Sequence, residues 1–280
     1  MTTDDRGLHF DQPHPARMYD YYLGGKDNYV ADRKAVADVL RVFPTMRTAA
    51  RTNRAFMHRA TRFLARQGVR QFLDIGTGIP TEPNLHQIAQ AIAPDSRVVY
   101  VDLDSVVLAH ARALMGGTPE GRTAYIQADV ADPQAILSAP ALLETLDLSK
   151  PVAVSLFAVM HFIVDAQNPY DIVDSYINAM PPGSYLAMSH STPDFDRVRA
   201  DKVVEVYQHN NLPLQLRSRE EFSHFFDGLE LVEPGIVAVH RWHPDAPDTR
   251  IPTLPRQTDD VDVLAEMDRA VSFYAGIARK

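Results

Sequence analysis

Short apolar runs alternate with amphipathic segments through most of the chain after Arg70. The five candidate strands are residues 71–76, 97–102, 123–129, 151–159 and 183–190. Segments with apolar positions three and four residues apart, which is helical spacing, lie at 85–93, 106–115, 133–147 and 170–180. This alternation is typical of βαβ units and predicts a parallel sheet with helices on its faces.

Both ends of the chain depart from this pattern. Residues 1–16 lack hydrophobic periodicity and predict a mobile or surface-draped leader, whereas 16–67 has helical spacing. After Ser191, the expected elements are helices at 200–211 and 218–228, a strand at 229–242, a Pro-rich surface linker at 243–260 and a strand at 271–278. Five parallel strands and a terminal pair predict a seven-stranded sheet in an α/β fold.

Composition narrows the function classes. The 280 residues are 45% hydrophobic and 23% charged, which predicts a folded core rather than disorder. The net charge of -8 disfavours a nucleic-acid partner, and no apolar stretch reaches the ~20 residues of a membrane span. The polar start has no signal-peptide pattern, so we expect a cytoplasmic protein without a membrane partner. Because the chain has no cysteine, disulfides, thiolate nucleophiles and Cys-ligated metals are excluded.

The first strand ends in LDIGTGIP, which contains Asp74, Gly76 and Gly78. Glycines at the carboxyl end of such a strand let the backbone turn sharply and approach a ligand, although they also occur in tight strand-to-helix turns. A dinucleotide fingerprint has a third glycine where this chain has Thr81, and the helix start is displaced toward Pro83. The turn therefore favours a cofactor with ribose and adenine but without a diphosphate.

Acidic residues end the next two strands as well. Asp102 follows Gly78 by 24 residues, about where a nucleotide-binding sheet places a carboxylate for the ribose hydroxyls. Asp129 ends the third strand. One such residue alone is usually a helix cap or a solvated turn, but three on successive strands indicate a nucleotide site.

Four strings carry a resemblance to a known family: ARMYDYYLGGKDN, LDIGTGIPT, VYVDLDSVVLAHARALM and FAVMHF. Over nearly its whole length the chain resembles S-adenosylmethionine-dependent methyltransferases, and within them the actinobacterial DUF574 family, with Met160 where that family has Leu. The resemblance implies a Rossmann-like, seven-stranded methyltransferase sheet, mostly parallel with an antiparallel last strand. It also implies a leader and helical cap or lid over 1–69 and a compact cofactor-binding domain over 70–280.

The resemblance further implies S-adenosylmethionine (SAM) as the cofactor and assigns residues to it. The implied cofactor-binding residues are Asp74, Gly76, Thr77, Gly78, Asp102, Leu103, Asp129, Val130 and Phe157. Asp74 would lie near the amino group of the methionine portion, Asp102 would bind the ribose diol, and Asp129 would accept from the adenine amine. The segment from Phe157 to His161 would line the methyl-transfer cleft.

Two histidines are candidates for a catalytic base. Methyl transfer is an in-line displacement, so the enzyme must align the acceptor and, for a hydroxyl, remove its proton. His161, after the fourth strand, is the first candidate and His190, after the fifth, is the second; either is alternatively a structural histidine. The acidic and histidine pairs near residues 194–196 and 240–243 are too sparse to specify a metal site.

The segment 19–33 combines four tyrosines, a glycine pair, a lysine and an asparagine, and we interpret it as a shaped loop rather than a helix. We hypothesise that it closes over the cofactor or substrate as a lid, with the aromatics alternatively anchoring the N-terminal helices. The candidate lid residues are Tyr19, Tyr22, Lys26 and Asn28.

The leading hypothesis is a SAM-dependent methyltransferase that acts on oxygen or nitrogen of a small molecule. A second hypothesis is a non-catalytic SAM-binding sensor or partner-binding protein on the same fold. A third, a nicotinamide-dependent oxidoreductase, is disfavoured by Thr81. Neither the acceptor nor the oligomeric state follows from the sequence.

Overall fold

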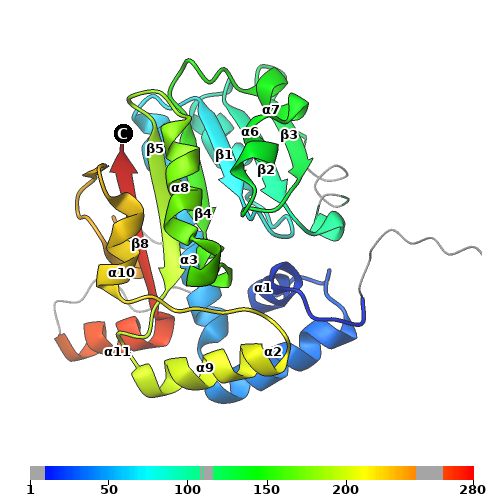
Figure 1. Cartoon of the computed structure of the whole chain (residues 1–280), viewed down its shortest axis with the longest axis vertical. Helices are drawn as coiled ribbons and strands as arrows, with labels where there is room; N and C mark the ends of the chain where they lie inside the picture. Colours follow the sequence, from blue (N-terminus) through cyan, green and yellow to red (C-terminus); the bar gives the residue numbers. More distant parts are fainter. Residues whose placement is uncertain (1–9, 108, 110–115, 244–260) are drawn as a thin grey trace, which may run out of the picture.

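One mixed sheet organises the computed structural model, which describes residues 10–107, 109, 116–243 and 261–280 (Figure 1). Its strands are β1 (Gln71–Ile75), β2 (Arg97–Asp102), β3 (Arg122–Gln127), β4 (Ala153–Phe157), β5 (Tyr185–Ser191), β6 (Glu230–Leu231), β7 (Val237–Ala238) and β8 (Phe273–Arg279). The strand order is β3-β2-β1-β4-β5-β8-β6, and β7 also pairs with β8. Strands β1 to β5 are parallel, whereas β8 runs antiparallel to β5. The predicted Rossmann-like fold class is confirmed.

The helices are α1 (Pro15–Leu23), α2 (Val30–Val42), α3 (Met46–Arg66), α4 (Leu85–Ile92), α6 (Pro133–Leu137), α7 (Pro140–Thr145), α8 (Pro169–Asn178), α9 (Arg197–His209), α10 (Arg219–Ser223) and α11 (Val261–Val271). Successive strand residues point to opposite faces of a sheet. Phe72 accordingly belongs to one buried cluster, with α1, α2, α3, α4 and α9, and Leu73 to the other, with α6, α7, α8 and α10. Because both faces are buried, the strands have continuous apolar runs.

The sheet reverses its strand order beside β1, since the chain adds β2 and β3 on one side and then returns to place β4 on the other. In open α/β sheets the ligand crevice lies at such a switch point, outside the carboxyl ends of the strands. Helices α1, α2 and α9 lie near this edge of the sheet (Figure 1).

Several expected elements differ in the structure. The strand expected over 229–242 is two short strands, because Pro234 has no N–H to donate and Gly235 turns the chain at φ 78°. The helix expected over 133–147 is interrupted before Pro140 for the same lack of a donor. The helix α11 was not predicted. The helix at 106–115 and the linker at 243–260 lie almost entirely outside the described residues.

The prediction of a loop over 19–33 was also wrong, because most of this segment is helical. Helix α1 starts after His14, whose side chain caps it, and continues to Leu23, so its tyrosines are helical. The helix stops at Gly24, which has φ 92°, a conformation that glycine adopts without strain. Only the short connection from Gly24 to Tyr29 is a loop.

Candidate functional site

The turn after β1 is built on two glycines with different roles. Gly76 has φ 74° and donates its N–H to the carbonyl of Val101 at 2.8 Å. A Cβ atom at Gly76 would lie 2.5 Å from a methyl carbon of Val159, so a larger residue does not fit. Gly78 has φ 69°, but a Cβ there would meet no atom within 4 Å. The turn is therefore packed against the segment that follows β4 at Gly76 and faces open space at Gly78.

Asp102, at the end of β2, joins this turn to the neighbouring strand. Its side chain is buried, and its two oxygens accept from the backbone N–H of Gly78 at 2.8 Å and of Asp104 at 2.9 Å. Burial raises the pKa of Asp102, and the two backbone hydrogen bonds oppose that shift. Each oxygen has a further lone pair with which to accept a ligand hydroxyl.

Asp74 ends β1 on the other side of the turn. Its side chain is 8% exposed, and burial raises its pKa to about 7, with the charge of Arg54 as the leading opposing influence. The Thr77 hydroxyl donates to the Asp74 carbonyl at 3.0 Å and lies 3.3 Å from a carboxylate oxygen. Thr77 thus fixes the turn and engages one oxygen of the Asp74 carboxylate, while the other oxygen has no hydrogen bond to the described residues.

Arg54 of α3 was not predicted as a site residue. Its Nη2 donates to the carbonyl of Thr81 and to that of Pro83, the latter at 3.2 Å. Its Nε is buried and has no hydrogen-bond partner in the described part of the chain. The sequence offered only an arginine in an amphipathic helix, and α3 reaches the β1 turn through tertiary packing alone.

The carboxyl ends of β2 and β3 form the next part of this edge. Leu103, which follows the buried Asp102 directly, is 56% exposed. Asp129 is exposed and accepts from the N–H of Ala131 at 2.9 Å, while the carbonyl of the buried Val130 accepts from Tyr176 at 2.8 Å. An apolar surface and an acidic side chain therefore lie beside the turn.

The end of β4 is held by aromatic and backbone contacts. Phe157 is half-buried and packs edge-on against Phe56 of α3, with ring centroids 5.6 Å apart. Ala158 has φ 54°, an uncommon conformation for a residue with a side chain, and its N–H donates to the Ser189 carbonyl at 3.1 Å. Such strain often accompanies a functional site.

The two candidate histidines lie together, with ring centroids 5.5 Å apart, but differ in their environments. His190 has no exposed surface; its Nδ1 donates to the Ser191 carbonyl at 2.7 Å and its Nε2 accepts from Arg217 at 3.0 Å. Burial and the charge of Arg217 lower its pKa to about 3. Both nitrogens are engaged, so this geometry does not support His190 as a base.

His161 is 5% exposed, and its buried Nδ1 has no hydrogen-bond partner among the described residues. Its ring packs against Phe162 and Phe273, with centroid distances of 4.3 and 5.9 Å. Burial lowers the pKa of His161 well below its ordinary value, and His190 and Arg217 add to the shift. His161 is therefore neutral at neutral pH and has a free ring nitrogen.

The candidate lid residues separate into buried contacts and one exposed charge. Tyr19 donates to the Ala50 carbonyl at 2.9 Å, and Tyr22 is 1% exposed. Asn28 is buried and donates to Asp20 at 2.8 Å. Only Lys26, of the four, is exposed.

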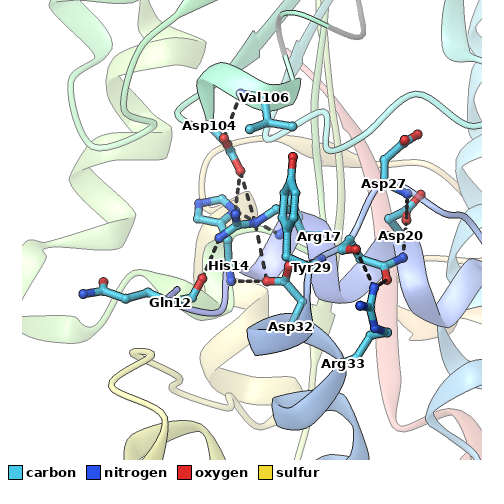
Figure 2. Close-up of polar contacts among 12 residues, drawn as sticks. Gln12, His14, Arg17, Asp20, Asp27, Tyr29, Asp32, Arg33, Asp104 and Val106 are labelled. Carbon is cyan, nitrogen blue, oxygen red and sulfur yellow. Dashed lines mark hydrogen bonds and ion pairs between the residues drawn. The ribbon is translucent and has the colours of Figure 1, made fainter. Parts of the chain in front are cut away.

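A polar cluster that is partly buried joins the N-terminal segment to the turn that follows β2 (Figure 2). The carboxylate of Asp104 lies 3.3 Å from Nδ1 of His14 and 3.7 Å from Nε of Arg17. Arg17 also lies 3.4 Å from Asp32, which is fully buried and accepts from the His14 N–H at 2.8 Å. His14, which lies in the segment 1–16 expected to be a mobile or surface-draped leader, thus contacts the loop that follows Asp102.

The described residues contain no group of three His, Cys, Asp or Glu side chains arranged to hold a metal ion. Within the same residues, no helix is long and apolar enough to cross a membrane.

All 280 residues match the family model described as S-adenosyl methyltransferase. The chain belongs to this family. It is 47% identical to a DUF574 family protein from Streptomyces avermitilis, with 97% of this chain and 98% of that chain covered and a TM-score of 0.89. It is 37% identical to a predicted methyltransferase from Thermobifida fusca, with 100% and 99% covered and a TM-score of 0.86. No curated protein sequence matches the chain.

The predicted membership is confirmed, and with it SAM as the cofactor of this methyltransferase family.

Proposed function

We propose that the protein transfers the methyl group of SAM to an oxygen or nitrogen of a small molecule. The observation that carries the proposal is the strand-end turn, where Gly78 faces open space and donates to the buried carboxylate of Asp102. This turn lies at the switch point of the sheet, and it combines space for a ligand with an acceptor for its hydroxyls.

The residues at this edge fit the parts of the cofactor. Asp74 would face the amino group, Gly76, Thr77 and Gly78 would support the methionine portion, and Asp102 would accept from the ribose diol. The exposed Leu103 and the acidic Asp129 suit the apolar face and the amine of adenine; Val130 and Phe157 would border the site. SAM, when bound there, supplies an electrophilic methyl group, and the protein must align the acceptor with it.

We assign His161, rather than His190, to the acceptor. His161 is neutral, and its Nδ1 has no hydrogen bond to the described part of the chain, so it can orient a hydroxyl or amine by hydrogen bonding and accept its proton. Its lowered pKa makes it a weak base, so orientation is the larger part of this role. His190, held by Arg217, instead supports the ring of His161.

We assign residues 1–69 to the cap or lid of this proposal, of which residues 1–9 lie outside the described residues. The contacts of His14 and Arg17 with Asp104 support it, because they join the cap to the loop after Asp102. Lys26 is the exposed residue of the candidate lid. We expect Lys26→Ala to weaken cofactor affinity or turnover; unchanged values for both would remove Lys26 from the lid. The expected cytoplasmic location rests on the sequence alone.

Calorimetry with SAM and its product S-adenosylhomocysteine tests the cofactor site. Asp102→Asn should weaken binding of both at least tenfold, since hydrogen bonds to a charged acceptor contribute about 1.5–3 kcal/mol. Asp201→Asn, on the exposed face of α9, is the control and should bind as the wild type does. No binding to either compound at millimolar concentration would refute the proposal.

A panel of small oxygen and nitrogen acceptors, assayed by release of S-adenosylhomocysteine, tests the reaction. Methyl transfer to one of these acceptors, at a rate that the His161→Ala substitution lowers, supports catalysis. Tight SAM binding with no transfer across the panel would favour the alternative of a SAM-binding sensor.

A further inference from the structure

A partly buried arginine, Arg54, lies beside the β1 turn with part of its hydrogen-bonding capacity unused. The two hydrogen bonds of its side chain in the described structure both leave from Nη2 and end on the carbonyls of Thr81 and Pro83. These carbonyls belong to the segment that follows the glycine turn, so they fix the guanidinium against the site. The Nε, which is buried, has no hydrogen-bond partner among the residues that the structure describes.

An unpartnered buried donor on a charged group is costly, because the group has lost water and gained nothing in return. Arginine has five N–H donors and no acceptor, and its planar fork matches the geometry of a carboxylate. A carboxylate-bearing ligand is therefore the chemistry that would satisfy Arg54.

Asp74 supplies the opposite charge at the same turn. The positive charge of Arg54 opposes the rise in the pKa of the buried Asp74 carboxylate, yet Arg54 forms no ion pair within the described residues. The guanidinium instead donates to the carbonyls of Thr81 and Pro83. Because the two opposite charges act on each other without forming an ion pair, each can take a partner from a ligand that carries both charges.

We propose that Arg54 binds the carboxylate of the methionine portion of SAM and, with Asp74 facing the ammonium, forms a site for a zwitterionic amino acid end. The inference rests on the proposed SAM site and adds a residue to it from α3, outside the βαβ motifs. It also explains why an N-terminal helix contacts the segment 81–83: the cap contributes a ligand-binding charge as well as cover.

Three ligands that share adenosine differ in which charged groups they carry, so their affinities distinguish the carboxylate from the ammonium. S-adenosylhomocysteine carries the carboxylate and the amino group, its decarboxylated analogue keeps only the amino group, and 5′-methylthioadenosine lacks both. Calorimetry would compare their affinities for the wild type, Arg54→Gln, Arg54→Lys and a control, Arg66→Gln, which changes an exposed arginine at the end of α3.

The proposal predicts that wild type binds S-adenosylhomocysteine at least tenfold more tightly than the decarboxylated analogue. Arg54→Gln should lose most of that preference and bind 5′-methylthioadenosine within twofold of the wild type. Arg54→Lys, which keeps the charge without the fork, should retain an intermediate preference. Arg66→Gln should match the wild type for all three ligands.

Several results would overturn the inference while leaving the SAM site intact. One is an unchanged preference for the carboxylate in Arg54→Gln, and another is an equal loss of affinity for all three ligands, which would assign Arg54 to the folding of segment 81–83. If the Arg54 variants do not fold, the wild-type comparison decides, because equal binding of the carboxylate and decarboxylated ligands excludes a carboxylate site. Failure of the wild type to bind S-adenosylhomocysteine at all would instead refute the proposed function.

Discussion

The buried carboxylate of Asp74 should make cofactor binding depend on pH. Burial raises its pKa to about 7, so the free protein carries this side chain mostly protonated at pH 6 and mostly charged at pH 8. A ligand ammonium beside Asp74 favours the charged form and moves the pKa back toward 3.8, its ordinary value. Binding below pH 7 must then release a proton, and that release opposes binding.

The size of the effect follows from the two pKa values. With the pKa at about 7 in the free protein and near its ordinary value in the complex, S-adenosylhomocysteine should bind about tenfold more tightly at pH 8 than at pH 6. The same values predict release of about 0.9 proton at pH 6 and about 0.1 at pH 8. Calorimetry in two buffers of different ionisation enthalpy measures both quantities.

Other groups that face Asp74 require a control. Arg54 from α3 stays charged in proteins, and burial keeps Tyr100 of β2 neutral by raising its pKa well above 10. Burial also raises the pKa of Asp102, so this second carboxylate is a further source of pH dependence. The Asp74→Asn variant distinguishes the two carboxylates, because it should remove most of the pH dependence of the affinity. Equal wild-type affinities at pH 6 and 8, or an unchanged pH dependence in Asp74→Asn, would refute the reasoning.

The same pKa has a consequence for stability. Because the folded protein holds the Asp74 proton more tightly than the unfolded chain does, its contribution to stability is present below pH 3.8 and is lost as the pH rises to about 7. Asp74→Asn should therefore be more stable than the wild type at pH 8, by at most about 4 kcal/mol, in urea unfolding without ligand. A less stable variant at pH 8 would contradict this.

Three further predictions concern packing and the cap. Gly76→Ala should destabilise the fold by about 3 kcal/mol, from positive φ and a clash with a valine, and Gly78→Ala by about 1 kcal/mol, from φ alone; equal urea midpoints would contradict this. Arg217→Met should lower the stability of the fold by about 3 kcal/mol or more, because Arg217 is 1% exposed and hydrogen-bonds His190 and two carbonyls; a variant as stable as the wild type would show that this network adds nothing. Arg17→Gln should speed protease cleavage within the N-terminal cap while the urea midpoint falls by less than in Arg217→Met, and unchanged cleavage would mean that the ion pair with Asp104 does not hold the cap.

Much of the sheet was predictable because its physical cause is local. Both faces of the sheet are buried, so each of β1 to β5 requires a continuous apolar run, and the intervening helices require apolar residues at helical spacing. The terminal region was less predictable, since β6 and β7 have two residues each and exist only through pairing with β8. The prediction of a loop over 19–33 was wrong because the glycine pair follows the tyrosines directly and made the whole segment resemble a loop. The tyrosines before Gly24 instead belong to α1, which ends there.

The sequence by itself determined the family, the parallel sheet and the position of the turn that contains Asp74, Gly76 and Gly78, because strand ends and glycine turns depend on neighbouring residues. Only the tertiary structure decided which distant side chains reach that turn. It brought Arg54 to the segment after the turn and buried His190 against Arg217, since helix packing and burial join residues far apart in the chain. The electrostatics of the site depend on those contacts, because a charge acts through its distance and its loss of water.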